Sequence, residues 1–203
     1  SKPRYVKALD NLGINLIFDI GANSGQFALS NLEHGFRGEI VSFEPTSEVY
    51  KQLKKNAEYF PNWKIHERAA VGEKCGNILI NIAGNSAASS SILLMGKAHS
   101  EAAPDANFIG SESVNLITLD SVFESYVSQG NKCLLKIDVQ GYEDQVLQGA
   151  ANSIRIIDAV KLECSLVSLY EGDKTFDYYF NFFEKNGFKL FDIIISNYAS
   201  HNF

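Results

Sequence analysis

Short apolar segments alternate along this chain with longer segments whose apolar residues recur every three or four positions. The short segments predict buried strands, and the longer ones predict amphipathic helices. Strands are predicted at residues 16–20, 39–43, 64–68, 77–82, 133–139, 159–164 and 188–195, and helices at residues 26–34, 46–60, 118–127, 143–151 and 176–185. This alternation predicts an α/β fold with a mostly parallel central sheet of about seven strands and helices on both of its faces.

The length and composition of the chain are those of one folded unit. It has 203 residues, of which 45% are hydrophobic and 21% are charged, so a single globular domain over residues 1–203 is expected. A net charge of −6 argues against a non-specific nucleic-acid surface, which needs a basic patch. The sequence contains no apolar run as long as a transmembrane helix, and its first residues do not resemble a signal peptide.

The cysteines, at positions 75, 133 and 164, are widely spaced. An odd number of cysteines without close pairs gives neither a disulfide framework nor a zinc-binding pattern. Cys133 and Cys164 lie in or beside apolar strand segments, where a cysteine usually acts as a small buried hydrophobe. We therefore expect a reducing, cytoplasmic compartment.

The first predicted strand ends in an acid, Asp19, and in a turn of small residues. Gly21 and Gly25 allow backbone conformations that a Cβ atom would hinder, and Asn23 tolerates left-handed geometry better than most residues. A plain strand-to-helix turn would have a similar pattern. The dinucleotide fingerprint G-x-G-x-x-G is absent, which disfavours a pyrophosphate ligand. Asp19 would also repel a phosphate, but it could neutralise an ammonium group.

Carboxylates also stand at the ends of three other predicted strands, at Glu44, Asp138 and Glu163. Glu44 could accept hydrogen bonds from a ribose diol, or it could favour the N-terminus of the helix that follows. Asp138 ends a nearly continuous apolar run, where a charge is costly to bury without a partner, although helix capping would also explain it. Because the carboxyl ends of parallel strands meet at one edge of a sheet, we expect these residues and Asp19 to converge there.

Several motifs, in this order along the chain, resemble those of the FkbM-type methyltransferases. They are FDIGANSG at 18–25, SFEP at 42–45, AAVG at 69–72, SSS at 89–91, TLD at 118–120, LKIDVQGYE at 135–143 and VLQGA at 146–150. The motifs extend over most of the chain, and they are specific only together. Gln140 departs from the pattern, because the family usually has Glu there. The resemblance implies the Rossmann-like class I fold of S-adenosylmethionine-dependent methyltransferases.

The resemblance also implies S-adenosylmethionine as the cofactor and assigns residues to it. The turn after the first strand would hold the methionine part, with Asp19 near its ammonium group, and Glu44 would bind the ribose hydroxyls. The segment 69–70 would flank the adenine, and Asp138 would lie near the methionine moiety or the acceptor. The cofactor-binding residues are then Asp19, Gly21, Asn23, Gly25, Glu44, Pro45, Ala69, Ala70 and Asp138.

The implied reaction is O-methylation of a hydroxyl on a sugar or secondary metabolite, so the expected partner is a small-molecule or glycan acceptor, without nucleic acid or membrane. A hydroxyl acceptor loses a proton, and Asp138 and Glu163 are the candidates for the catalytic base or for orienting the acceptor. His66 and His99 are weaker alternatives. No second acid follows either carboxylate at close spacing, so no metal is expected.

The small polar residues at 83–91 suggest a functional or mobile loop, and the resemblance implies that residues 86–91 would close over the site. Acceptor specificity is expected to lie in segment 84–113. Two other functions stay open at this point. One is a nicotinamide-dependent oxidoreductase on a Rossmann-like fold, which the missing glycine fingerprint disfavours. The other is a non-catalytic nucleoside-binding module that keeps the fold.

Overall fold

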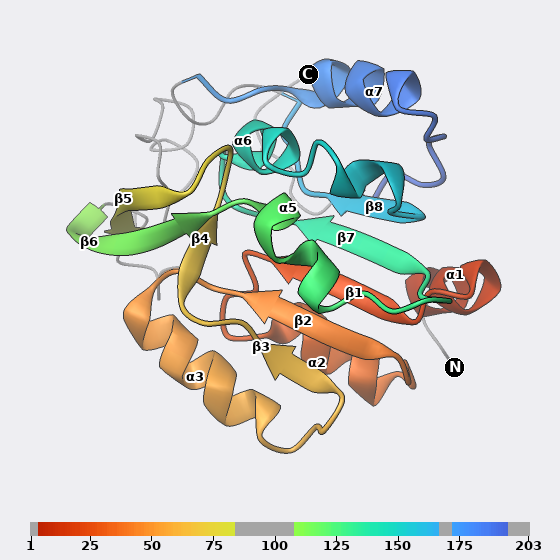
Figure 1. Cartoon of the computed structure of the whole chain (residues 1–203), viewed down its shortest axis with the longest axis horizontal. Helices are drawn as coiled ribbons and strands as arrows, with labels where there is room; N and C mark the ends of the chain where they lie inside the picture. The colour runs from red at the N-terminus through yellow and green to blue at the C-terminus, as the bar shows by residue number, and fades with distance from the viewer. Residues whose placement is uncertain (1–3, 84–107, 167–171, 195–203) are drawn as a thin grey trace, which may run out of the picture.

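The structure, a computed structural model, describes residues 4–83, 108–166 and 172–194. Its centre is a parallel sheet of five strands in the order β3-β2-β1-β7-β8 (Figure 1). These strands are β1 (Leu16–Ile20), β2 (Glu39–Phe43), β3 (Trp63–Ile65), β7 (Cys133–Ile137) and β8 (Ala159–Leu162). The direction of strand order reverses between β1 and β7, which is where open parallel sheets bind ligands.

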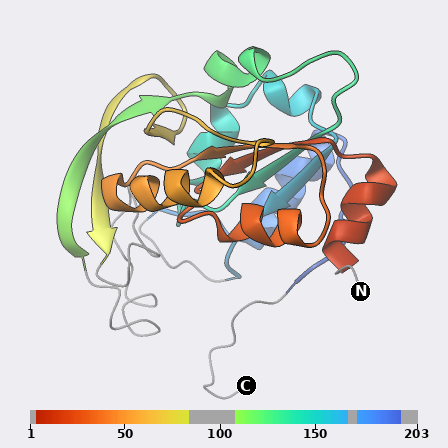
Figure 2. The same ribbon diagram turned by 90° about the horizontal axis from the view of Figure 1, so that it is seen from below.

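Helices cover both faces of this sheet. One face packs against α1 (Arg4–Leu12), α2 (Gln26–Glu33) and α3 (Ser47–Ala57). The other packs against α5 (Leu119–Val122), η2 (Phe123–Ser125), α6 (Glu143–Gln148), η3 (Ser153–Arg155) and α7 (Phe176–Lys185). Successive side chains along a strand point to opposite faces of the sheet, so Phe18 packs into one core and Ile17 into the other. Figure 2 shows α2 and α5 on opposite sides of the sheet.

A second sheet of three strands lies on the side to which the arrowheads of β1, β2 and β7 point (Figure 1). It consists of β4 (Ala69–Val71), β6 (Phe108–Ile117) and β5 (Gly76–Ala83). Strand β6 is parallel to β4 and antiparallel to β5. Along β5, Ile78 and Ile80 pack into a small core while Leu79 is exposed, which is the period of two expected for a half-buried strand.

The predicted α/β fold with a mostly parallel sheet and helices on both faces is confirmed, but the number of strands is not. The central sheet has five strands rather than about seven. The segment predicted at 77–82 belongs to the second sheet. The predicted strand at 188–195 is wrong for residues 188–194, which have no regular structure. Phe191 and Ile194 there are largely exposed, so these apolar residues do not extend the sheet.

The predicted helix at 118–127 is split into the short helices α5 and η2, and the helix α1 was not predicted. Thr118 accepts a hydrogen bond from the Ser121 backbone N–H at 3.1 Å, which confirms its expected role as N-cap. Most of segment 84–113, including the predicted loop residues 86–91 and His99, lies outside the described residues. Within the described ranges, no helix has the length and hydropathy needed to cross a bilayer.

Candidate functional site

A row of polar side chains crosses the central sheet on the face that α1, α2 and α3 cover. Ser42, Asp19 and Lys136 are paired neighbours on β2, β1 and β7. Ser42 Oγ donates to Asp19 Oδ2 at 3.1 Å, and Lys136 Nζ lies 3.0 Å from Asp19 Oδ1. Asp19 has no exposed area. The cation that Asp19 faces in this structure is therefore the ammonium group of Lys136.

Neighbouring carboxylates favour the charged form of Lys136 although this side chain is buried. Desolvation alone would lower its pKa, but the charges of Asp19 and Asp138 outweigh desolvation, so the pKa is raised. Its Nζ donates to the carbonyl oxygen of Gly21 at 2.8 Å and lies 3.7 Å from Asp138 Oδ2. Lys136 thus connects the turn after β1 with the carboxylate that follows β7.

The turn after β1 approaches its neighbours too closely for ordinary side chains. Gly21 has φ of 73°, and a Cβ atom there would lie 1.8 Å from the carbonyl oxygen of Asp138. Gly25 has φ of 94°, and a Cβ atom there would lie 2.3 Å from the ring of Trp63. Asn23 is also left-handed, with φ of 50°. The expectation that these three positions need permissive residues is confirmed.

Glu44 joins the turn after β1 to the turn after β2. Its Oε2 accepts a hydrogen bond from the Asn23 backbone N–H at 2.9 Å. Its Oε1 accepts from the backbone N–H and the hydroxyl of Thr46, at 2.9 and 2.5 Å. Burial raises the pKa of Glu44, and these hydrogen bonds oppose the rise. Of the roughly four acceptor positions of a carboxylate, these contacts within the chain use three.

Asp138 and Glu163 meet at the ends of β7 and β8. The backbone N–H of Asp138 donates to Ile20 O, and that of Glu163 donates to Ile137 O, which continues the parallel register beyond the strands. The charge of Asp138 acts on the carboxyl group of Glu163. Desolvation raises the pKa of Glu163, and the neighbouring Asp138 raises it further. The side chain of Asp138 is 28% exposed, so this pair is open to a ligand.

The turn after Asp138 is held by Glu143, at the first position of α6. Its carboxylate accepts hydrogen bonds from the backbone N–H groups of Val139 and Gly141, both at 3.1 Å. Burial is the main cause that raises the pKa of Glu143 to about 7. Gln140 between them is left-handed, with φ of 57°, and its amide donates to Asp138 Oδ1 at 2.9 Å. The departure from the family pattern at Gln140 therefore directly touches Asp138.

The expected adenine-flanking residues lie on a different sheet from the other site residues. Ala69 and Ala70 are 2% and 3% exposed, and their methyl groups pack into two separate cores. Only their backbone is left to meet a ligand. The Arg68 guanidinium links this strand to the rest of the site, because it donates to Pro45 O at 2.9 Å and to Glu112 at 3.0 Å.

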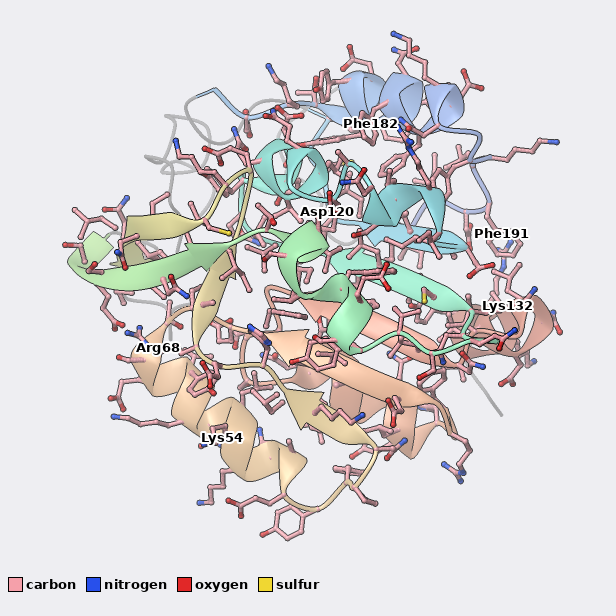
Figure 3. All side chains as sticks on the ribbon, in the orientation of Figure 1. Lys54, Arg68, Asp120, Lys132, Phe182 and Phe191 are labelled. Carbon is pink, nitrogen blue, oxygen red and sulfur yellow. The ribbon has the colours of Figure 1, made fainter. Side chains whose placement is uncertain are left out.

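Two residues that the sequence singled out have structural partners. His66 Nδ1 lies 2.7 Å from Tyr126 Oη, and burial lowers its pKa. Asp120, which Figure 3 marks at the start of α5, accepts hydrogen bonds from the backbone N–H groups of Asn152 and Ser153 at 2.9 and 2.8 Å. The TLD motif therefore ties α5 to η3. In the part of the chain that the structure describes, no three His, Cys, Asp or Glu side chains are grouped so as to hold a metal ion.

Comparison with known proteins places this geometry in a family. The profile of the methyltransferase FkbM domain matches residues 19–190, from the end of β1 to beyond α7. The chain belongs to the FkbM methyltransferase family. All the carboxylates that converge at the sheet edge lie within the matched FkbM region.

A curated relative of this FkbM chain is the hexuronic acid methyltransferase AglP of Haloferax volcanii. The two are 26% identical over 153 residues, which are 73% of this chain and 55% of AglP. The chain thus spans about half the length of that relative. No solved structure gave a significant match.

Sequence reasoning missed two residues of this FkbM site, Lys136 and Glu143. Lys136 interrupts the apolar run of β7 two positions before Asp138, so it shares the face of Asp138 and was detectable as a charge inside a buried strand. Glu143 stands two residues after Gly141, in the motif at 135–143, and was noted only as part of the resemblance to the FkbM family. Its contact with the backbone of the turn had no signal in the sequence.

Proposed function

We propose that this FkbM-family protein transfers the methyl group of S-adenosylmethionine to a hydroxyl group of a sugar or secondary metabolite. The observation that supports this best is the carboxylate of Glu44, which accepts hydrogen bonds from the turn after β1 and from the turn after β2, at the carboxyl ends of these neighbouring strands. This is the position from which an acid binds a ribose in related folds. Family membership supports methyl transfer, and the name of the AglP relative supports a sugar acceptor.

The residues present fit such a cofactor. S-adenosylmethionine carries an ammonium and a sulfonium group, and the carboxylates of Glu44, Asp138 and Glu163 give this edge a complementary negative charge. When bound, the cofactor supplies a methyl group already activated by the positive sulfur. In this proposal the carboxylate of Glu44 binds the ribose, and the turn from Gly21 to Gly25 holds the methionine part. Pro45 and the backbone of residues 69–70 border the adenine.

Asp19 takes a different part in this proposal from the one its position in the sequence suggested. Because its carboxylate is fully buried against Lys136 and Ser42, it holds the turn rather than the cofactor itself. The protein's remaining task is to align the acceptor oxygen with the methyl group and to exclude water, which contributes up to about 7–11 kcal/mol in favourable cases.

The Asp138–Glu163 pair is the proposed acceptor of the hydroxyl proton. A base works best when its pKa lies near the working pH, and the raised pKa of Glu163 moves that carboxylate in this direction. Asp138 lies beside Glu163 and contributes to this rise in pKa. The proton of the acceptor hydroxyl passes to Glu163 as the oxygen becomes nucleophilic. A general base of this kind contributes about 10²–10⁴-fold.

Replacing Glu44 with Gln tests the cofactor site. Calorimetry with S-adenosylhomocysteine is expected to show a dissociation constant about 10- to 100-fold higher, because a charge-assisted hydrogen bond is worth about 1.5–3 kcal/mol. Glu48→Gln is the matched control, since the Glu48 side chain is 80% exposed on α3. Unchanged affinity in a folded Glu44→Gln protein would remove Glu44 from the site.

Transfer of labelled methyl groups tests the reaction. We expect label from S-adenosylmethionine in one of a panel of hydroxylated sugars that includes hexuronic acids. A protein that binds S-adenosylhomocysteine but transfers no labelled methyl group to any component of a cell extract would favour the non-catalytic nucleoside-binding module. Tight NADH binding without S-adenosylhomocysteine binding would favour the oxidoreductase.

A further inference from the structure

A continuous row of polar contacts crosses the sheet from β3, its outer strand, over β2 and β1 to the carboxyl end of β7. Trp63 Nε1 donates to Ser42 Oγ at 2.9 Å, and Ser42 Oγ donates to Asp19. Asp19 pairs with Lys136, whose Nζ lies 3.7 Å from Asp138 Oδ2. Trp63, Ser42 and Asp19 are at most 5% exposed and the Lys136 side chain is 6% exposed, whereas the Asp138 side chain is 28% exposed. The row is therefore buried at Trp63 and partly exposed to solvent at Asp138, in the candidate site.

We propose that Lys136 is a positioning residue that acts on the cofactor through Asp138, and that Asp19 acts only through Lys136. This inference rests on the proposed function, because it requires that Asp138 meets the cofactor. Asp19 has no exposed area with which to contact a ligand. Lys136, by contrast, reaches the site from within the sheet, since the same ammonium group contacts Gly21 O and approaches Asp138.

Lys136 is surrounded mainly by carboxylates, and its positive charge therefore matters for the charge balance of the candidate site. Lys136 and Lys161 both lie over the ring of Phe27 on α2, at 5.7 and 5.6 Å from its centre. The acidic groups that interact with Lys136 are Asp19 on β1, Glu44 after β2, Asp138 after β7 and Glu163 after β8. The carboxylates thus outnumber the two lysines. Loss of Lys136 would leave the Asp138 carboxylate facing mainly like charges, which repel it.

The burial of this ion pair also determines how it can be tested. Removing Lys136 alone would leave Asp19 as an uncompensated buried charge, and such changes are strongly destabilising. The double variant Asp19→Asn/Lys136→Met removes both charges together. Hydrophobic or neutral replacement of a whole buried pair is often tolerated, so a folded protein without the Lys136 charge is attainable.

A double-mutant cycle measures whether Lys136 acts through Asp138. Calorimetry gives the dissociation constant of S-adenosylhomocysteine for the wild type, the double variant, Asp138→Asn and the combined triple variant, with melting temperatures as a check of folding. We expect the double variant to bind about tenfold more weakly than the wild type. The triple variant should bind no more weakly than Asp138→Asn alone, because coupled residues are not additive.

Lys132→Met is the matched control, because Lys132 is exposed and immediately precedes β7 (Figure 3). Its dissociation constant should equal that of the wild type. A folded double variant that binds like the wild type would overturn the inference and leave the proposed function intact. Fully additive losses in the triple variant would also overturn it. A wild type that binds no S-adenosylhomocysteine would reject the proposed function and this inference with it.

Ser42→Ala replaces the double variant in the cycle if the double variant does not fold. It keeps both charges and removes only the hydroxyl that donates to Asp19 Oδ2. We expect a weaker affinity for S-adenosylhomocysteine in the wild-type background and no further loss in the Asp138→Asn background. Unchanged affinity in both backgrounds would overturn the inference.

Discussion

At the scale of single residues, Glu143 has a pH dependence that follows from its surroundings. It is 5% exposed, and burial raises its pKa to about 7. The folded protein therefore holds a proton on Glu143 that the unfolded chain releases nearer the ordinary value of about 4.3. The stabilisation from this proton is complete below that value and is lost as the pH rises through 7.

Glu143→Gln should remove this pH dependence. Its amide oxygen can still accept from the Val139 and Gly141 backbone N–H groups, while it carries no charge to desolvate. Relative to the wild type, the variant is expected to gain up to about 3 kcal/mol of unfolding free energy between pH 5 and pH 8. Urea unfolding at several pH values measures this gain, with the exposed Glu124→Gln as control. A difference that does not vary with pH would contradict the raised pKa.

The sequence predicted single residues well at positions where the backbone conformation restricts the type of residue. Gly21, Asn23 and Gly25 were identified from their conformational freedom, and all three have positive φ. It did not predict the partner of Asp19, because Lys136 lies 117 positions away and only the register of β1 against β7 brings them together. A single side chain carries no signal of such a long-range contact.

At the scale of elements, the close approach of the turn after β1 to Asp138 fixes the site. Gly21→Ala should destabilise the protein by several kcal/mol more than Gly130→Ala. Both glycines have positive φ, which costs an alanine roughly 1–2 kcal/mol. A Cβ atom at Gly130 meets open space, however, whereas one at Gly21 would lie 1.8 Å from the Asp138 carbonyl oxygen.

Chemical denaturation of the two alanine variants measures this difference. Binding of S-adenosylhomocysteine should be lost in Gly21→Ala and kept in Gly130→Ala, since Gly130 lies in the loop before β7, at the amino end of the strand. Equal destabilisation of the two variants would show that the turn can move away from Asp138 without consequence.

The predicted elements agree best with the structure where periodicity and breakers coincide. Helix α2 is bounded by Gly25 and Gly35, and both of these glycines are left-handed. The segment 118–127 has an apolar face but forms only α5 and η2. There Asp120 binds the backbone N–H groups of residues 152 and 153, so the path of the chain follows a tertiary contact rather than helix periodicity.

At the scale of the whole molecule, the alternation of elements predicted the architecture but not the extent of the sheet. Strand β5 has the apolar pattern of a strand, yet it pairs with β6 in the second sheet. Residues 188–194 have an equally apolar pattern, and Phe191, labelled in Figure 3, is 69% exposed there. The apolar pattern indicates that a segment is able to form a strand. Which sheet it joins depends on which strand edge the fold brings next to it.

The crystal structure of the protein with S-adenosylhomocysteine is the most direct test of the account. We expect the ribose beside Glu44 and the methionine part along the turn from Gly21 to Gly25, with Asp138 nearby and Asp19 still paired to Lys136. A ligand bound elsewhere, for example in the hollow lined by Asp120, Phe123 and Ile156, would contradict it, as would the absence of any bound ligand at saturating concentration.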